Sequence, residues 1–255
     1  MVKFTLTLID ILILAVVQGI TEWLPISSSG HLVIIEKYLG LTPPLIFNVM
    51  LHVGTLFAVL AVFWRDIIEI VKALVRLDFK TDEGKLALFI AVGSVPTALI
   101  GFFFHDILES FFYNLLVVGI ALLITGFVLF VSERRKNSRE LNYLDSLLIG
   151  VAQGVAIIPG ISRSGVTIAT GLLRKVKKET AFRYSFLLSV PAVIGATIME
   201  SRDLVIGDVD AVAMFLGAII SMIVGYVSLK FLQKIVMEEK FHLFAYYCWI
   251  VGLIT

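Results

Sequence analysis

Long apolar runs separated by short polar segments dominate the hydropathy pattern of this chain. Six of them approach or reach the roughly 20 residues that a helix needs to cross the hydrocarbon core of a bilayer. They cover residues 47–64, 86–104, 115–131, 180–200, 209–229 and 241–255. The alternating apolar and polar segments of about ten residues that mark a membrane β-barrel are not present. The pattern therefore predicts an all-α, polytopic membrane protein with six transmembrane helices.

Two more apolar segments, residues 8–39 and 144–174, are long enough for more than one crossing but are broken near their centres. In the first, Pro25 lacks a backbone N–H and disfavours helix at Leu24. Residues 27–30 then offer a turn and an N-cap for a new helix. The second segment is broken by a similar run, "PGISRSG". Each segment is predicted to form a helix–turn–helix hairpin.

The two hairpins are predicted to be copies of one another. At a fixed offset of 135 positions, without gaps, Gln18, Gly19, Ile26, Ser27, Ser29 and Gly30 coincide with Gln153, Gly154, Ile161, Ser162, Ser164 and Gly165. Internal repeats of this kind are typical of helical membrane proteins. We expect one transmembrane domain over residues 1–255, with repeat 1 at about 8–131 and repeat 2 at about 144–255.

Composition agrees with a membrane protein and excludes other classes. Of the 255 residues, 59% are hydrophobic and 16% are charged, and the mean hydropathy is +0.99, whereas soluble domains carry about 25% charged residues. Cys248 is the only cysteine, so internal disulfides and cysteine-based metal sites are excluded. A net charge of +1 gives no indication of nucleic-acid binding.

Lysine and arginine orient the chain in the membrane. Residues 65–85, 132–143, 174–183 and 230–240 hold five, four, five and three of them, whereas residues 105–114 hold none. The rich connections are predicted to be cytoplasmic. This assignment requires that both hairpins are re-entrant, and it gives them opposite topology, with tips that meet near the midplane. Broken helices at that depth are tolerated when they line a cavity, and this cavity is the predicted site.

Titratable groups concentrate at the two hairpins. Arg163 is the one basic residue at a hairpin tip, and intramembrane arginine needs an anionic partner, either a ligand or Glu22. Gln18 and Glu22 are four residues apart and share a helix face, so the carboxylate can serve as base, metal ligand or arginine partner. His31 begins the returning helix and can exchange a proton or bond the turn backbone. The clustering favours catalysis. We expect Glu22 and His31 to work as one unit with Ser27 and Ser28, and Gln18 to be auxiliary.

The tips also favour phosphate binding. "ISSSG" and "ISRSG" each precede a helix, so free N–H groups and helix dipoles converge on the cavity. The predicted phosphate ligands are Ser27, Ser28, Ser162, Arg163, Ser164, Gly165 and Thr167. His52, His105 and His242 have no neighbouring cluster in the sequence and are predicted to lie outside the site.

At "QGITEWLPISSSGH" and "PGISRSGVT" the sequence resembles the undecaprenyl-pyrophosphate phosphatase, or bacitracin-resistance, family over essentially its whole length. The resemblance implies hydrolysis of a polyprenyl diphosphate to the monophosphate and inorganic phosphate, for recycling of the lipid carrier in cell-wall glycan synthesis. It implies a multi-pass protein of the plasma membrane that depends on a divalent cation, Mg²⁺ or Ca²⁺. The family's acidic motif falls on Gln18 and Glu22, where Gln18 stands at a position that is glutamate in many members.

The resemblance leaves several points open. Glu22, Ser27, Ser28, His31 and Arg163 are the expected catalytic residues, with Glu22 and Gln18 as metal ligands. The nucleophile is Ser27 or Ser28, His31, or a cation-bound water, and we rank serine first. The rival hypothesis is an anion or polyprenyl-phosphate transporter, because carriers also use inverted repeats with broken helices. The prenyl chain length and the oligomeric state, with a homodimer among the options, do not follow from the sequence.

Overall fold

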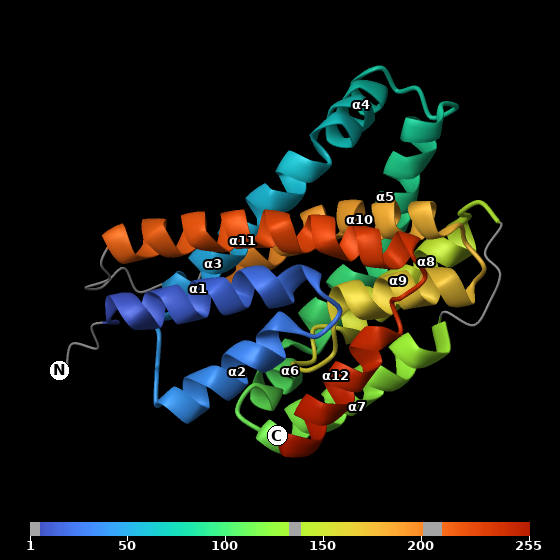
Figure 1. Cartoon of the computed structure of the whole chain (residues 1–255). Helices are drawn as coiled ribbons and strands as arrows, with labels where there is room; N and C mark the ends of the chain where they lie inside the picture. Colours follow the sequence, from blue (N-terminus) through green and yellow to red (C-terminus); the bar gives the residue numbers. More distant parts are fainter. Residues whose placement is uncertain (1–5, 133–138, 201–210) are drawn as a thin grey trace.

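A computed structural model describes residues 6–132, 139–200 and 211–255 of the chain (Figure 1). The described residues form twelve α-helices and no β-strand beyond one isolated bridge between Arg139 and Val176. The helices are α1 (Leu8–Trp23), α2 (Ser28–Leu39), α3 (Leu45–Val62), α4 (Trp64–Val75), α5 (Asp82–Phe103), α6 (His105–Phe111), α7 (Leu115–Ser132), α8 (Tyr143–Val155), α9 (Arg163–Leu173), α10 (Lys178–Glu200), α11 (Ala211–Met237) and α12 (Leu243–Ile254). The predicted polytopic all-α class is confirmed.

Five helices, α3, α5, α7, α10 and α11, are long and apolar enough to cross a membrane. The predicted sixth span, residues 241–255, is a shorter apolar helix, because Phe241 and His242 belong to a turn and α12 has 12 residues. At 1.5 Å per residue α12 is about 18 Å long, less than the roughly 30 Å of hydrocarbon. Two polar connections contain additional helices, α4 and α6.

Both broken segments are helix–turn–helix hairpins, α1–α2 and α8–α9. They begin alike: Thr7 and Asp10 form a capping box at the start of α1, and Asn142 and Asp145 form one at the start of α8. These residues also differ by 135 positions. Leu24, before Pro25, has extended backbone and ends α1.

The first helix of each hairpin packs against one long helix. Helix α1 packs against α11, and α8 packs against α5 (Figure 1). Both pairs of helices approach closely at glycines that match at the offset of 135 positions. A Cβ at Gly19 would lie 2.7 Å from that of Val224, and a Cβ at Gly154 would lie 2.5 Å from Ile100 Cδ1. Each hairpin thus packs on a long helix of the other half of the chain. The division into two repeats remains a prediction. Two copies of one unit would be expected to pack in the same way, as α1 on α11 and α8 on α5 do.

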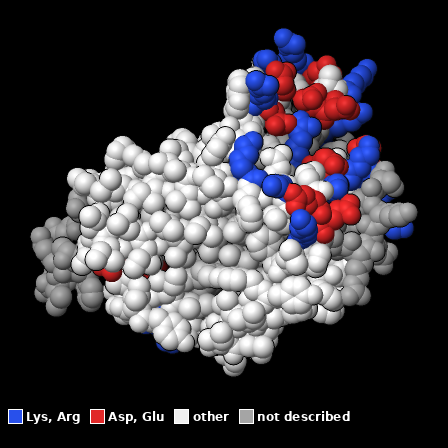
Figure 2. Space-filling view, in the orientation of Figure 1, with Lys and Arg blue, Asp and Glu red and all other residues white. Residues whose placement is uncertain are grey.

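Charge is gathered at one end of the molecule. Figure 2 shows Lys, Arg, Asp and Glu crowded over the region where α4 and the start of α5 project, while most of the remaining surface in this view is uncharged. Many large apolar side chains are exposed, including Leu99 and Phe102 on α5 and Phe127 on α7. An uncharged belt of this kind suits contact with lipid.

Candidate active site where the hairpin tips meet

The turns of the two hairpins are in direct contact. The backbone N–H of Gly160 donates to Ser27 Oγ at 3.0 Å, and Ser164 Oγ donates to the Leu24 carbonyl at 3.3 Å. Both turns need a left-handed residue, with φ of 68° at Ser27 and 98° at Gly160. A non-glycine residue in this region carries strain that persists where the surroundings fix it, as the contact with Gly160 does here.

Each turn leads into a helix that is capped by a serine. Ser27 Oγ accepts a hydrogen bond from Gly30 N at 3.3 Å, and Ser162 Oγ accepts one from Gly165 N at 3.2 Å. Helices α2 and α9 therefore begin at Ser28 and Arg163. Because the turns touch, two helix N-termini with their partial positive charge lie close together, an arrangement that suits an anion.

Glu22, one residue before the end of α1, joins these two helix starts. Its Oε1 is paired with Arg163 Nη2, and its Oε2 accepts hydrogen bonds from Ser28 Oγ at 2.5 Å and from Gln18 Nε2 at 3.0 Å. Only 6% of the Glu22 side chain is exposed. The carboxylate thus contacts a hydroxyl of one hairpin and the guanidinium of the other.

The group around Glu22 also includes His52 of α3, which the sequence analysis wrongly left outside the site. His52 Nδ1 lies 2.9 Å from Gln18 Nε2 and 3.4 Å from Glu22 Oε2. The signal that would have found it is the one applied to Arg163: an ionisable side chain within an apolar span is expensive and usually functional. The argument holds for a histidine as well, because its imidazole can carry a charge.

Arg163 retains the capacity to bind a ligand. Its guanidinium carbon lies 5.0 Å from the centroid of the Trp23 ring, a cation–π contact that fixes the plane of the group. Nη2 is paired with Glu22, whereas Nη1 is buried and has no hydrogen-bond partner. A buried, unpaired donor of a charged group is costly, and an anionic oxygen would satisfy it.

His31 faces away from the carboxylate. Its Nδ1 lies 2.8 Å from the Ser27 carbonyl, which can only accept, so Nδ1 carries the proton. The lone pair of Nε2 then accepts from the Tyr247 hydroxyl of α12 at 2.8 Å, and the two rings stack with centroids 5.6 Å apart. Among the described contacts none joins His31 to Glu22. The expected direct partnership of the two is therefore not present.

The remaining predicted phosphate ligands occupy different places. The Ser162 hydroxyl and the Gly165 N–H bond each other in the cap of α9, and Ser164 bonds the other turn. Thr167 Oγ1 bonds the Arg163 carbonyl at 2.7 Å and Ser185 Oγ at 2.6 Å, so Thr167 faces α10 and not the other hairpin. Thr167 is four residues, or about 6 Å of helix axis, further along α9 than Arg163, and this places its hydroxyl beside α10.

The residues available for a metal ion are limited. Within residues 6–132, 139–200 and 211–255, no group of three His, Cys, Asp or Glu side chains could hold one. Gln18 Oε1, in contrast, is a fully buried acceptor without a partner, in the amide that contacts Glu22. A carboxylate and an amide oxygen suit a hard cation that takes its other ligands from water or phosphate.

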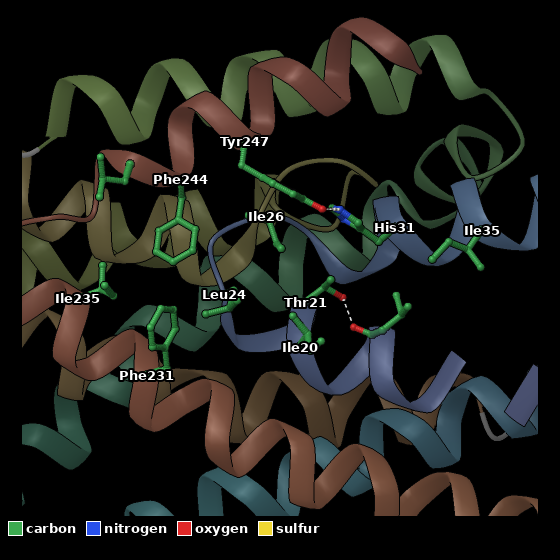
Figure 3. Close-up of a pocket in the computed structure, with 12 residues that line it drawn as sticks. Ile20, Thr21, Leu24, Ile26, His31, Ile35, Phe231, Ile235, Phe244 and Tyr247 are labelled. Carbon is green, nitrogen blue, oxygen red and sulfur yellow. Dashed lines mark hydrogen bonds between the residues drawn. The ribbon is translucent and has the colours of Figure 1, made fainter. Parts of the chain in front are cut away.

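An apolar cavity of about 560 Å³ opens beside His31 and Tyr247 (Figure 3). Helices α1, α2, α11 and α12 contribute its walls, which are mainly aliphatic and aromatic. The Thr21 hydroxyl, one of its few polar groups, donates back to the Val17 carbonyl at 2.7 Å. A cavity with these walls is suited to a hydrocarbon chain. Its residues are Val17, Ile20, Thr21, Leu24, Ile26, His31, Ile35, Phe231, Ile235, Leu243, Phe244 and Tyr247.

The chain is similar to known proteins over nearly its whole length. Residues 11–254 match the family model described as "Bacitracin resistance protein BacA". Similar proteins named "Undecaprenyl-diphosphatase" include that of Methanosphaera stadtmanae, 42% identical over 98% of this chain and 97% of the relative. Those of Halothermothrix orenii and Desulforapulum autotrophicum are 42% and 44% identical, each over 95% of both chains.

Proposed function

The chain belongs to the bacitracin resistance protein BacA family, and we propose that it is a membrane-embedded undecaprenyl-diphosphatase. It hydrolyses undecaprenyl diphosphate, or a related polyprenyl diphosphate, to the monophosphate and inorganic phosphate. The reaction recycles the lipid carrier for cell-wall glycan synthesis. The transporter hypothesis is not favoured, because curated relatives aligned over nearly the whole chain are named as diphosphatases.

One observation carries the proposal: the Glu22 carboxylate contacts both the Ser28 hydroxyl and the Arg163 guanidinium. A base on a hydroxyl is the arrangement of an activated nucleophile, and an arginine beside it can neutralise phosphoryl oxygens. Since the two residues begin two different helices, a phosphate bound between them also meets two helix N-termini.

The same contacts favour Ser28 over Ser27 as the nucleophile. Ser27 Oγ accepts from Gly30 N and Gly160 N and therefore holds the turn and the two hairpins together. Ser28 Oγ instead donates to Glu22 Oε2 at 2.5 Å. His31 lies with its basic nitrogen on Tyr247, which supports a role in shaping the turn and not in attack.

The reaction follows from this geometry in two displacements. Glu22 takes the hydroxyl proton as Ser28 Oγ bonds the terminal phosphorus, and the bond from that phosphorus to the bridging oxygen breaks, which releases the prenyl monophosphate. Glu22 passes this proton to the departing monophosphate and is again a base. Water then attacks the phosphoserine, Glu22 takes a proton from the water and returns it to Ser28 Oγ as the bond from phosphorus to Oγ breaks, and inorganic phosphate leaves. Arg163 Nη1 is free to bind a phosphoryl oxygen throughout, since positioning and charge neutralisation are the main needs of phosphoryl transfer.

A divalent cation, Mg²⁺ or Ca²⁺, belongs to the proposal. Gln18 and Glu22 are the residues that would hold it, together with phosphate oxygens, and the unpartnered Gln18 Oε1 supports this. When bound, the cation would supply further neutralisation of phosphoryl charge.

The cavity beside His31 is the proposed place of the first isoprenoid units. Ile235→Trp on α11 would partly fill it, and we expect KM for a C15 or C55 diphosphate to rise roughly tenfold, the equivalent of about two buried methylenes. A C5 diphosphate should be unaffected. Ile223→Trp, at an exposed position of α11 outside the cavity, is the control. An unchanged KM for the long substrates would place the chain elsewhere.

The membrane in question is proposed to be the plasma membrane, with the charged end of the molecule in the cytoplasm (Figure 2). Both hairpins would then be re-entrant. A cysteine at Ser110 in α6 should be labelled from outside by an impermeant maleimide in a Cys248→Ser background, and one at Glu140 only from inside. Residues 133–138 of the same predicted cytoplasmic connection lie outside the described residues. A homodimer is one option for the assembly.

Phosphate release from a polyprenyl diphosphate tests the function. Purified protein should release one phosphate per substrate in the presence of Mg²⁺ or Ca²⁺ and much less after chelation. Absence of release under both conditions, together with diphosphate flux into liposomes, would contradict the proposal.

A further inference from the structure

His52 is the one member of the Glu22 group that the reaction above does not use. It lies in the second turn of α3, and 30% of its side chain is exposed, against 6% for Glu22. Its contacts go to Gln18 and Glu22, the two residues proposed to hold a cation. An imidazole nitrogen directed at such a pair is a potential third ligand.

The three polar atoms form a triangle with the dimensions of a coordination face. Gln18 Nε2 lies 3.0 Å from Glu22 Oε2 and 2.9 Å from His52 Nδ1, and His52 Nδ1 lies 3.4 Å from Glu22 Oε2. Two ligands that are each about 2.1 Å from a metal ion lie about 3.0 Å apart at a right angle and about 3.4 Å apart at the tetrahedral angle. All three edges fall close to this interval.

The Gln18 amide provides a second, independent observation. Its oxygen is fully buried and has no hydrogen-bond partner, while its nitrogen occupies the corner of the triangle. Rotation of the amide by 180° exchanges the two atoms. It would place the unpartnered oxygen at that corner, where a metal ion would satisfy it.

The carboxylate is arranged for the same purpose. Arg163 pairs with Glu22 Oε1, and the triangle includes the other oxygen, Oε2. The guanidinium and a metal ion could therefore bind different oxygens of one carboxylate. Oε2, which also accepts the Ser28 hydroxyl at 2.5 Å, would divide its two lone pairs between that hydroxyl and the ion. The orientation of Glu22 is held from both sides, as the ligands of metal sites usually are.

We propose that His52 Nδ1, Gln18 Oε1 and Glu22 Oε2 form a facial three-ligand site for a divalent metal ion. This inference rests on the proposed cation site and deepens it. A set of one imidazole nitrogen and two oxygens favours first-row transition ions such as Mn²⁺, Co²⁺ and Zn²⁺. Ca²⁺ and Mg²⁺ prefer sites made of oxygen ligands alone. The open positions of the ion face substrate or water.

Cobalt binding tests the site without reference to activity. Chelator-treated full-length protein in detergent should bind one Co²⁺, with visible absorption bands that differ from those of the aqueous ion. His52→Leu should weaken Co²⁺ binding by at least about tenfold. Loss of a group that only supports a metal ligand already costs roughly tenfold to a hundredfold in affinity. His105→Leu, which removes an exposed histidine of α6 paired with Asp106, should leave binding unchanged.

A cysteine at position 52 separates ligation from a structural role. His52→Cys should lose Co²⁺ affinity but gain Cd²⁺ binding, with thiolate-to-metal absorption in the ultraviolet, because thiolates prefer soft ions. The unaltered protein, whose single Cys248 is buried, should show no such absorption. If His52→Leu does not fold, His52→Gln and His52→Cys provide the same comparison.

Two results would overturn the inference: no Co²⁺ binding by the unaltered protein, or the same affinity and spectrum in the protein and its folded His52 variants. Phosphate release by the unaltered protein is measured separately with Mg²⁺ and Ca²⁺. Release without Co²⁺ binding would leave the diphosphatase intact and remove this site. Tight Co²⁺ binding by a protein that releases no phosphate with any ion would support the metal site and contradict the diphosphatase.

Discussion

The hairpins α1–α2 and α8–α9 share their backbone construction but differ in chemistry. In both, a serine caps the second helix through the N–H three residues on, and the same serine lies 3.3 Å from the hydroxyl two residues on. The side chains at matched positions on this shared backbone are different. At the three positions that matter most, the first hairpin has Glu22, Ser28 and His31, and the second has Ile157, Arg163 and Val166.

This difference teaches how an active site can arise between two similar elements. Ser28 and Arg163 occupy the same place, the first residue of a capped helix, and both are directed at Glu22. Neither hairpin tip alone holds a carboxylate base, a hydroxyl and an arginine or lysine. We infer that the capping serines maintain the frame, and that chemistry resides where the hairpins have diverged.

The largest effect is expected at Ser28. Ser28→Ala removes the proposed nucleophile, and kcat should fall by at least about 10³-fold, as is common when a nucleophile is lost. Ser29→Ala at the same tip, whose hydroxyl bonds only Ser27 Oγ among the described contacts, should lose far less. Steady-state phosphate release from both purified variants is the measurement. Comparable losses in the two would make the tip structural.

Arg163 should come next. Arg163→Ala and Arg163→Lys should each lower turnover by roughly 10² to 10³, because lysine cannot reproduce a planar donor that pairs with Glu22 through one nitrogen and a phosphate through the other. Arg174→Lys, at the far end of α9 and paired with Asp145, is the control. Near-normal rates in folded Arg163→Ala would reduce this residue to a pairing role.

A double-mutant cycle tests which residues share a task. Glu22→Gln should cut turnover by about 10² or more, and Ser28→Ala should then cost little further, because the two act on one proton. Glu22→Gln and His31→Ala should combine nearly additively, since their hydrogen bonds go to different partners. Strong non-additivity of the second pair would restore the single unit that the sequence suggested.

The smallest effects are expected where the hairpins are alike. Ser162→Ala removes the cap of α9 and should lower the free energy of unfolding by about 1 kcal/mol, with a modest loss of activity. Ser27→Ala should cost more, because Ser27 Oγ also bonds Gly160 N of the other turn. Thermal unfolding in detergent compares the two. Equal costs would show that the bond between the tips contributes nothing measurable.

The sequence is sufficient to predict features that depend on local chain chemistry. Apolar run length identifies the five long spans, and Pro25 with the serine–glycine runs locates both hairpin turns, because breaks and caps are properties of neighbouring residues. The cost of a lone charge in hydrocarbon predicts an anionic partner for Arg163, either a ligand or Glu22, and the structure pairs it with Glu22.

Features that depend on packing between distant segments were not predictable in this way. His52 reaches Gln18 only because α3 packs beside α1. His31 turns to Tyr247 because α12 brings that ring within reach of the start of α2. Thr167 was expected at the tip and instead bonds Ser185 of α10. In each case the contact joins helices that are distant in the sequence, so only the tertiary arrangement determines it.

Trapping of the covalent intermediate tests the central claim, that Glu22 of one hairpin activates Ser28 for attack on a phosphate bound by Arg163 of the other. Purified protein is mixed with polyprenyl diphosphate labelled in its terminal phosphate, quenched in acid within one turnover, and digested. We predict label on the peptide that contains Ser28, and none in Ser28→Ala or Glu22→Gln. Rapid turnover without any labelled peptide, or with label on His31, would contradict the account.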